Sequence, residues 1–102
     1  MTNFYKSKQW VAKRSARLRI DSYLCQECKR YGKTTQANTV HHIYPLEDYP
    51  EYKLTTDNLV SLCNKCHNAM HDRTTNELTQ KGLTWKARTT IPPPKNIFLT
   101  DP

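Results

Sequence analysis

The sequence predicts an α+β fold, one small domain in which two helices pack on a short antiparallel hairpin and a metal-binding cysteine cluster clamps them together. Residues 7–21 have helical apolar spacing without glycine or proline, residues 34–43 and 58–62 have the composition of strands, and a Cys-x-x-Cys pair lies outside each strand. With 102 residues there is room for one domain. We expect residues 1–90 to form it and residues 91–102, which contain three consecutive prolines, to form an extended tail.

The elements follow in chain order. Residues 7–21 predict an amphipathic helix, and Gly32, after the first cysteine pair, favours a turn at positive φ. The strands 34–43 and 58–62 pair antiparallel across a loop that contains two prolines and three acidic residues. A second helix, 66–78, is expected to pack on them, because a two-stranded hairpin alone is marginal in water.

Positive charge dominates the composition, and apolar residues are scarce. The 16 Lys and Arg outnumber the 9 Asp and Glu, the net charge is +7, and 36% of the residues are hydrophobic. A chain of this size buries only about two-thirds of its unfolded surface. A large self-sufficient core is therefore not expected, and we expect the cysteines to help hold the fold.

The positive charge is concentrated near the N-terminus. The first 30 residues carry eight basic and two acidic side chains. Such a segment suits a polyanion, because Lys and Arg neutralise phosphates and release condensed counterions. Composition alone leaves a solvated charged face as the alternative. The candidate DNA-binding residues are Lys13, Arg14 and Arg17.

Neither a membrane span nor a signal peptide is expected, since no apolar run approaches the roughly 20 residues that a span requires. A cytoplasmic protein is the default expectation. Cysteines stay reduced there, so four of them at regular spacing indicate metal binding rather than disulfides.

Two identical Cys-x-x-Cys pairs predict a zinc site. Each pair can place two thiolates on one ion, and two pairs complete a tetrahedral site with Zn–S distances of about 2.3 Å. Four sulfur ligands leave no open position, so this zinc is expected to be structural, adding on the order of 10 kcal/mol to folding. Buried thiols or a redox pair are the alternatives, which the repetition disfavours. The ligands would be Cys25, Cys28, Cys63 and Cys66.

All four histidines fall within residues 41–71. His67 and His71 are four positions apart on the predicted helix, hence on one face, a spacing that offers two imidazoles to one cation. His41 and His42 end the first strand, where neighbouring side chains point to opposite faces, so both can serve one site only if the strand bends. Taken alone, His67 and His71 would more simply be surface residues, but the cluster of four favours a site.

The histidines of such a cluster can have two different chemical roles. Three neutral imidazoles could hold a divalent cation, and a fourth left unligated has a pKa near neutrality, suited to taking a proton from water. A metal beside a phosphate stabilises negative charge on phosphoryl oxygens and on the leaving alkoxide. With a basic helix alongside, these parts predict hydrolysis of a phosphodiester.

The order of these motifs resembles the HNH endonuclease family, in particular its small phage members, over residues 4–75. The motifs are Ser7-x-x-Trp10-x-x-x-Arg14, Cys25-x-x-Cys28, Val40-His41-His42-Ile43, Asp57-Asn58-Leu59 and Leu62-Cys63-x-x-Cys66-His67-Asn68. The resemblance implies a ββα-metal fold, in which a hairpin and a helix grip one divalent cation beside a zinc knuckle.

The resemblance also implies a role for each site residue. His42 is then the general base, His41 and His67 are metal ligands, and His71 matches the third metal position of members with an all-histidine site. Asn58 ties the hairpin loop to itself by hydrogen bonds to the backbone, and so orients His42. Many members carry Asp where this chain has His41, so the site is softer, and Mg²⁺, Mn²⁺, Ni²⁺, Co²⁺ and Zn²⁺ compete for it.

Two functions from different classes follow. One is a metal-dependent endonuclease that cuts or nicks duplex DNA; by its resemblance to phage members it would work in the host cytoplasm, beside terminase and portal, in genome packaging. The other is a non-catalytic zinc-knuckle DNA-binding or adaptor protein, which has no use for the histidine cluster. The acidic loop with Glu47, Asp48 and Glu51 is interpreted as solvated rather than as a second metal site, and Trp10 and Trp85 as packing residues.

Overall fold

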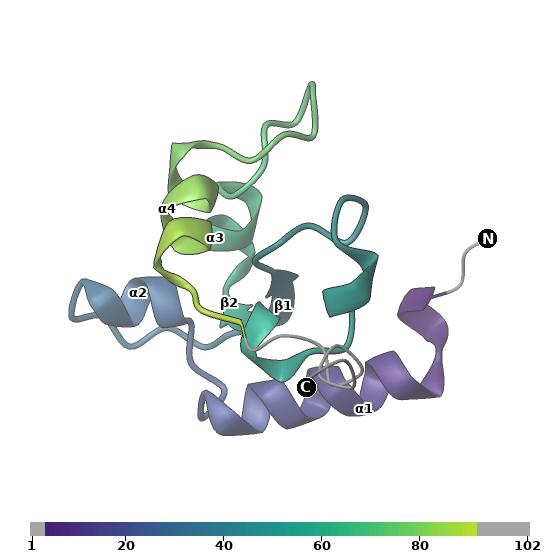
Figure 1. Ribbon diagram of the computed structural model, residues 1–102. Helices are drawn as coiled ribbons and strands as arrows, with labels where there is room; N and C mark the ends of the chain where they lie inside the picture. Colours follow the sequence, from purple (N-terminus) through teal and green to yellow (C-terminus); the bar gives the residue numbers. More distant parts are fainter. Residues whose placement is uncertain (1–3, 92–102) are drawn as a thin grey trace, which may run out of the picture.

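The computed structural model describes residues 4–91 as a hairpin enclosed by short helices (Figure 1). In chain order, its elements are the 3-10 helix η1 (Phe4–Lys6), α1 (Lys8–Ile20), α2 (Gln26–Arg30), β1 (Thr39–His42), the 3-10 helices η2 (Pro50–Tyr52) and η3 (Thr56–Asn58), β2 (Leu59–Leu62), α3 (Asn64–Asn68) and α4 (Gln80–Arg88). The α+β class, the antiparallel hairpin and the N-terminal helix are thereby confirmed. Apart from Ile91, the predicted tail lies outside the described residues. Over the described range, no helix is both long enough and apolar enough to cross a bilayer.

The helix α1 packs along one side of the hairpin and contacts both strands (Figure 1). Ser7 caps its N-terminus, since the Ser7 hydroxyl accepts a hydrogen bond from the Trp10 backbone N–H at 3.1 Å. Its buried side chains are Trp10 and Leu18. Val11 and Ile20, however, are 50% and 58% exposed, so the amphipathic character is weaker than predicted.

The hairpin has a continuous register, from Thr39 opposite Leu62 to His42 opposite Leu59. Successive side chains alternate between its faces. The face toward α1 contributes to a core cluster of Trp10, Leu18, Ala37, Val40 and Leu59. The opposite face contributes to a second cluster of Cys25, Ile43, Val60, Leu62 and Met70. Adjacent residues of β1 therefore serve two different sides of the sheet, and the strand keeps its regular pairing.

The first strand is shorter than the predicted segment 34–43. The backbone of residues 35–37 bonds instead to the chain just before α2: the Cys25 N–H donates to the Thr35 carbonyl at 2.7 Å, and the Ala37 N–H donates to the Tyr23 carbonyl at 2.8 Å. After α2 the chain turns back through Gly32, which adopts the expected positive φ of 78°. These bonds attach the first cysteine pair to the hairpin.

The predicted helix 66–78 is wrong, because α3 ends at Asn68 and the chain then turns. The Asp72 carboxylate accepts hydrogen bonds from the backbone N–H groups of Thr74 and Thr75, at 2.8 and 3.0 Å. Asn76 then takes a positive φ of 64°. Short polar side chains that bond to their own backbone favour turns over helix, and here that preference overrides the helical spacing of His67, Met70, His71 and Thr74.

The helix α4 is an element that the sequence pattern does not predict. Thr79 caps it, since its hydroxyl accepts from the Gly82 N–H at 3.2 Å. Gly82 also allows a close approach, because a Cβ there would lie 2.5 Å from the Met70 carbonyl oxygen. As a result, α4 packs tightly on the turn that follows α3.

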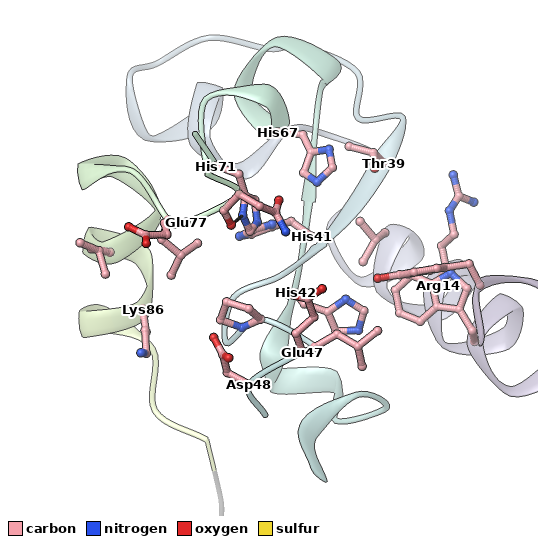
Figure 2. A pocket seen from close by; sticks show the side chains of 18 of the residues that line it. Arg14, Thr39, His41, His42, Glu47, Asp48, His67, His71, Glu77 and Lys86 are labelled. Atoms are coloured by element: carbon pink, nitrogen blue, oxygen red, sulfur yellow. Dashed lines mark hydrogen bonds between the residues drawn. The ribbon is translucent and has the colours of Figure 1, made fainter. Parts of the chain in front are cut away.

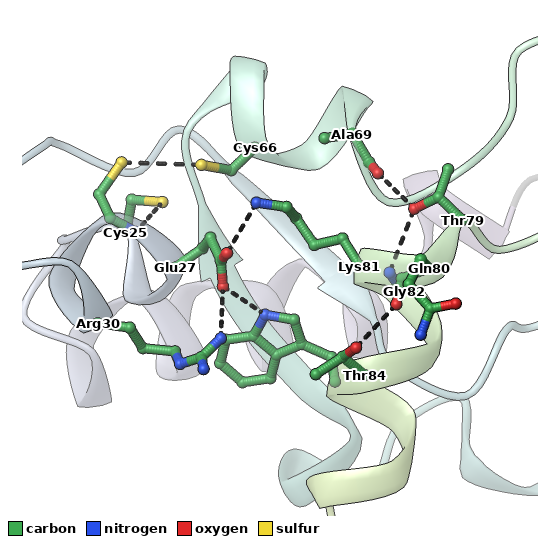
Figure 3. Close-up of polar contacts among 12 residues, drawn as sticks. Cys25, Glu27, Arg30, Cys66, Ala69, Thr79, Gln80, Lys81, Gly82 and Thr84 are labelled. Carbon is green, nitrogen blue, oxygen red and sulfur yellow. Dashed lines mark hydrogen bonds and ion pairs between the residues drawn. The ribbon is translucent and has the colours of Figure 1, made fainter.

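A buried carboxylate joins α2 to α4 (Figure 3). Glu27 is 2% exposed and accepts from the Trp85 indole N–H at 2.9 Å, while Lys81 and Arg30 pair with it at 2.9 and 3.1 Å. Burial by itself would raise the pKa of Glu27, but the bonds from Lys81, Trp85 and Arg30 outweigh it and hold the pKa below its ordinary value. The ionised carboxylate thus fastens α4 beside the cysteine pairs.

Candidate active site

A cleft of about 1290 Å³ opens over β1, and all four histidines line it. Figure 2 shows His41 and His42 in its middle, with Arg14 from α1 on one side and Lys86 from α4 on the other. The cleft therefore brings together elements that lie far apart in the sequence.

His42 is held by two contacts of different kinds. Its Nε2 lies 3.0 Å from the Lys53 carbonyl oxygen. Because a carbonyl can only accept, this bond places the proton on Nε2 and leaves the lone pair on Nδ1. The ring also stacks on the Trp10 indole, with centroids 4.8 Å apart and planes at 22°. Burial lowers the pKa of His42, against the opposing effect of the Lys53 bond, so the ring is neutral at pH 7 and Nδ1 can accept a proton.

His41 points to the opposite face and meets the other two histidines. Its ring centroid lies 5.5 Å from that of His67 and 5.4 Å from that of His71. Burial, followed by the neighbouring imidazoles, lowers the pKa of His41 to about 3, so its ring is neutral. Its Nε2 is buried without a hydrogen-bond partner. A buried nitrogen without a partner is costly, and a metal ion bound there would satisfy it.

His71 reaches this group although it does not lie on a helix with His67. It follows α3 and forms an isolated bridge with Leu78. Its Nδ1 lies 3.3 Å from the Asn76 carbonyl oxygen, which places the proton on Nδ1 and leaves a lone pair on Nε2. Metal-ligating histidines commonly donate their second N–H to a backbone carbonyl in this way. Three imidazoles thus gather at one side of the cleft, and this donor set fits a divalent cation.

Asn58 is fully buried and cross-links the loop between the strands. Its Oδ1 accepts from the Tyr44 N–H at 2.7 Å, and its Nδ2 donates to the carbonyls of Tyr44 and Tyr52 at 3.1 and 3.3 Å. The Lys53 carbonyl that holds His42 directly follows Tyr52. Asn58 therefore fixes the segment that orients His42 and does not face the cleft.

The four cysteines form a second, separate cluster. Their sulfur atoms all lie within 4.8 Å of one another, and this is the one group in the described part of the chain whose potential ligand atoms are gathered so closely. Burial raises the pKa of the Cys63 thiol, but hydrogen bonds from the Cys66 N–H and from the other thiols outweigh burial and lower this pKa to about 7. Four sulfur donors at this spacing fit a tetrahedral metal centre without an open position.

The three candidate DNA-binding residues of α1 have different surroundings. Arg17 donates to both carboxylate oxygens of Asp21, at 3.1 and 2.9 Å, and to the Thr56 carbonyl at 3.2 Å. Lys13 donates to the Thr56 hydroxyl at 3.4 Å. Arg14 lines the cleft and donates to a backbone carbonyl of the segment before β1 at 3.3 Å. Arg14 is thus beside the histidines, whereas the guanidinium of Arg17 is occupied within the fold.

Three features of the site are absent from the sequence prediction. Trp10 stacks on His42, a contact that the N-terminal motif containing Trp10 could have signalled. The Lys53 carbonyl is a backbone group, so the residue type at this position does not indicate its bond to His42. Lys86 reaches the cleft from the unpredicted helix α4, with its ammonium 5.0 Å from the Tyr49 ring centroid.

Glu47 and Asp48, two of the acidic loop residues interpreted as solvated, are exposed and line the cleft.

Comparisons with known proteins agree with this geometry. The model of the family described as HNH endonuclease matches residues 25–73. The crystal structure of the deep-sea thermophilic bacteriophage GVE2 HNH endonuclease with manganese ion is 48% identical, with a TM-score of 0.62, over 64% of this chain and 71% of that one. No curated protein matches the chain. The family match includes every cysteine and histidine of the two clusters, while α1 and α4 lie outside it.

Proposed function

The chain belongs to the HNH endonuclease family, and from that premise we propose that it is a metal-dependent nuclease that cuts or nicks duplex DNA by hydrolysing phosphodiester bonds. The observation that carries the proposal is the state of His42, a neutral ring with its Nδ1 lone pair free in a cleft shared with three further histidines. We assign residues 1–90 to a single nuclease domain.

The proposed roles follow from the contacts. His42 accepts the proton of the attacking water at Nδ1, while Nε2–H stays bonded to the Lys53 carbonyl. Asn58 holds that loop in place. His41, His67 and His71 are assigned as ligands of the divalent cation. When bound, such a cation would polarise the scissile phosphate and stabilise the leaving oxygen. Manganese, named for the structural neighbour, is the first ion to try, followed by Mg²⁺, Ni²⁺, Co²⁺ and Zn²⁺.

The cysteine cluster is assigned a structural Zn²⁺. Four thiolates are the donor set that Zn²⁺ prefers in closed sites, and two Cys-x-x-Cys pairs are its usual sequence form. The cluster joins the start of α2 to the start of α3. An ion there would therefore connect the segment before β1 to the segment after β2.

DNA is proposed to enter along the side of the cleft formed by α1. Arg14 lines the cleft and keeps hydrogen-bond donors for a phosphate, with Lys13 one position earlier. Arg17 was included in this set on the sequence, but its bonds to Asp21 and Thr56 favour a role in the fold. The proposed phosphate contacts are therefore Arg14 and Lys13.

A supercoiled plasmid tests the proposal. Wild-type protein with each of the five ions in turn should nick or linearise the plasmid, and a chelator should stop it. His42→Ala should lower the cleavage rate by at least the roughly 10²-fold typical of losing a general base, with DNA binding and zinc content unchanged. Cleavage by His42→Ala at the wild-type rate would remove His42 from the mechanism. Binding without cleavage for every ion would establish the adaptor function instead.

We also propose an association with genome packaging, beside the terminase and the portal. Its support is the resemblance of the motifs to small phage members and the bacteriophage source of the structural neighbour. Co-purification of the tagged protein with terminase subunits and portal of the same phage tests it, with His42→Ala as a variant that prevents DNA damage. Absence of both proteins after nuclease treatment of the lysate would exclude a stable complex.

A further inference from the structure

The ring of His42 needs more than its hydrogen bond to be held in place. The terminal torsion of a histidine side chain is broad, so its rotamer does not set the plane of the ring. The bond from Nε2 to the Lys53 carbonyl fixes one end of the ring but leaves its tilt about that contact free. A second contact, with the face of the ring, is required to aim Nδ1.

Trp10 makes that contact. Its indole stacks on His42 at 4.8 Å and 22°. Phe4 and Tyr5 lie farther away, at 6.1 and 6.3 Å, and are inclined to the imidazole by 49° and 68°. Among the aromatic side chains of residues 4–91, Trp10 is therefore the one that lies flat against His42.

Trp10 is itself firmly held. It is 4% exposed, and its backbone N–H bonds to the Ser7 cap in the first turn of α1. The rings of Phe4 and Tyr5 pack against the indole at 5.4 and 5.6 Å. An indole fixed by a helix start and two further rings provides a rigid surface for the imidazole.

We propose that Trp10 is a positioning residue for the reaction, which sets the plane of His42 so that Nδ1 faces the attacking water. The inference rests on the proposed role of His42 as the base. It places α1, which lies outside the region matched by the family model, in the catalytic unit. If Trp10 only filled the core, its replacement would lower folding stability without a specific loss of turnover.

Three variants of the full-length, zinc-loaded protein separate these roles. Trp10→Leu removes the flat ring, and Trp10→Phe keeps one. Leu18→Ala, on the same helix and in the same core cluster, is the control that weakens packing away from His42. Each is assayed with saturating Mn²⁺ on an oligonucleotide duplex, at a temperature where circular dichroism shows it folded.

For Trp10→Leu, kcat should fall at least about tenfold, as expected for a misplaced base, while KM and Mn²⁺ affinity stay within about twofold of wild type. Trp10→Phe should restore most of the loss, and Leu18→Ala should keep kcat. In the double variant with His42→Ala, Trp10→Leu should cause no further loss. A wild-type kcat for Trp10→Leu, or an equal loss for Leu18→Ala, would overturn the proposal.

A measurement on the wild-type protein keeps the test decisive if Trp10→Leu does not fold. Nitrogen-15 NMR should show His42 in one neutral tautomer, protonated at Nε2, and its ring protons should be shifted upfield by the indole. Mixed tautomers with ordinary proton shifts would contradict the stacking. Failure of this inference alone appears as an inactive His42→Ala beside a fully active Trp10→Leu, whereas an active His42→Ala refutes the proposed function itself.

Discussion

The cysteine cluster and the histidine cluster are both built around the same hairpin, but they differ in closure. The four cysteine sulfurs lie within 4.8 Å of one another and come from two local motifs, one before β1 and one after β2. The ring centroids of His67 and His71 lie 5.5 and 5.4 Å from that of His41, and among the described residues the potential ligand atoms of these three histidines are not all gathered within 4.8 Å; the rings open on a cleft. A closed centre can only hold the chain together, whereas an open one leaves room for a substrate.

The comparison teaches that the proposed structural and catalytic roles fall on two separate clusters of this small domain. In the proposed assignment the cysteine side stabilises the fold, while the histidine side leaves Nε2 of His41 without a hydrogen-bond partner for the catalytic ion to satisfy. The following variants should therefore act on one side and spare the other.

The largest effect is expected from Cys63→Ser. A structural zinc site contributes on the order of 10 kcal/mol to folding, comparable to the whole stability of a typical domain. The variant should lose its zinc and its helical circular dichroism together. Elemental analysis after removal of loosely bound metal measures the first, and a melting curve measures the second. A folded variant without zinc would show that the cysteine side does not carry the fold.

On the histidine side, His67→Ala should spare the fold and weaken the binding of the catalytic ion. Loss of an outer-shell partner lowers metal affinity roughly 10- to 100-fold, and loss of a ligand should lower it at least as much. Excess Mn²⁺ should then restore part of the cleavage, while His42→Ala stays inactive at every Mn²⁺ concentration. Titration of Mn²⁺ against cleavage rate measures both. Equal rescue of the two variants would contradict the assignment of His42 as the base and His67 as a metal ligand.

The sequence predicts the cysteine side better than the histidine side. Each Cys-x-x-Cys pair is a local motif whose geometry depends on four residues, so its spacing alone indicates a metal centre. The structure brings both His67 and His71 to His41, but the helix predicted to carry both ends at Asn68, before His71. The turn at Asp72 and Asn76 decides the position of His71, and its side-chain bonds to the backbone outweigh the helical spacing from which the helix was predicted.

Long-range contacts explain most of the remaining differences. The helix α4 packs beside the cysteine pairs through Glu27, which is 54 residues away from Lys81 along the chain. Similarly, Arg17 looks like a DNA contact in the sequence, but the Thr56 carbonyl that it meets is 39 residues away. Neither partner can be read from a local pattern. The antiparallel pairing of the hairpin, by contrast, is predicted from the composition of two short segments and the loop between them.

A smaller effect is expected from Glu27→Gln, which tests how α4 is attached to the cysteine side. Gln keeps the shape but leaves Lys81 and Arg30 without an anionic partner. Unfolding free energy should fall by about 2 kcal/mol, less than the roughly 3–5 kcal/mol of a fully buried pair, because both cations are partly exposed. Urea unfolding measures it. Zinc content should remain at wild type, and a loss of zinc instead would make Glu27 part of the metal centre.

The smallest effect is expected from Arg14→Ala, with Arg17→Ala as its matched partner one turn further along α1. Arg14 lines the cleft, so its loss should remove one phosphate contact and reduce the slope of log affinity against log salt by about 0.9. Arg17 is bonded to Asp21 and Thr56, so its loss should lower the melting temperature and leave the slope as it is. Fluorescence anisotropy with a short duplex at several salt concentrations measures the slopes. If Arg17→Ala flattens the slope and Arg14→Ala does not, DNA approaches α1 from the side away from the histidines, and the cleft is not where the duplex is held.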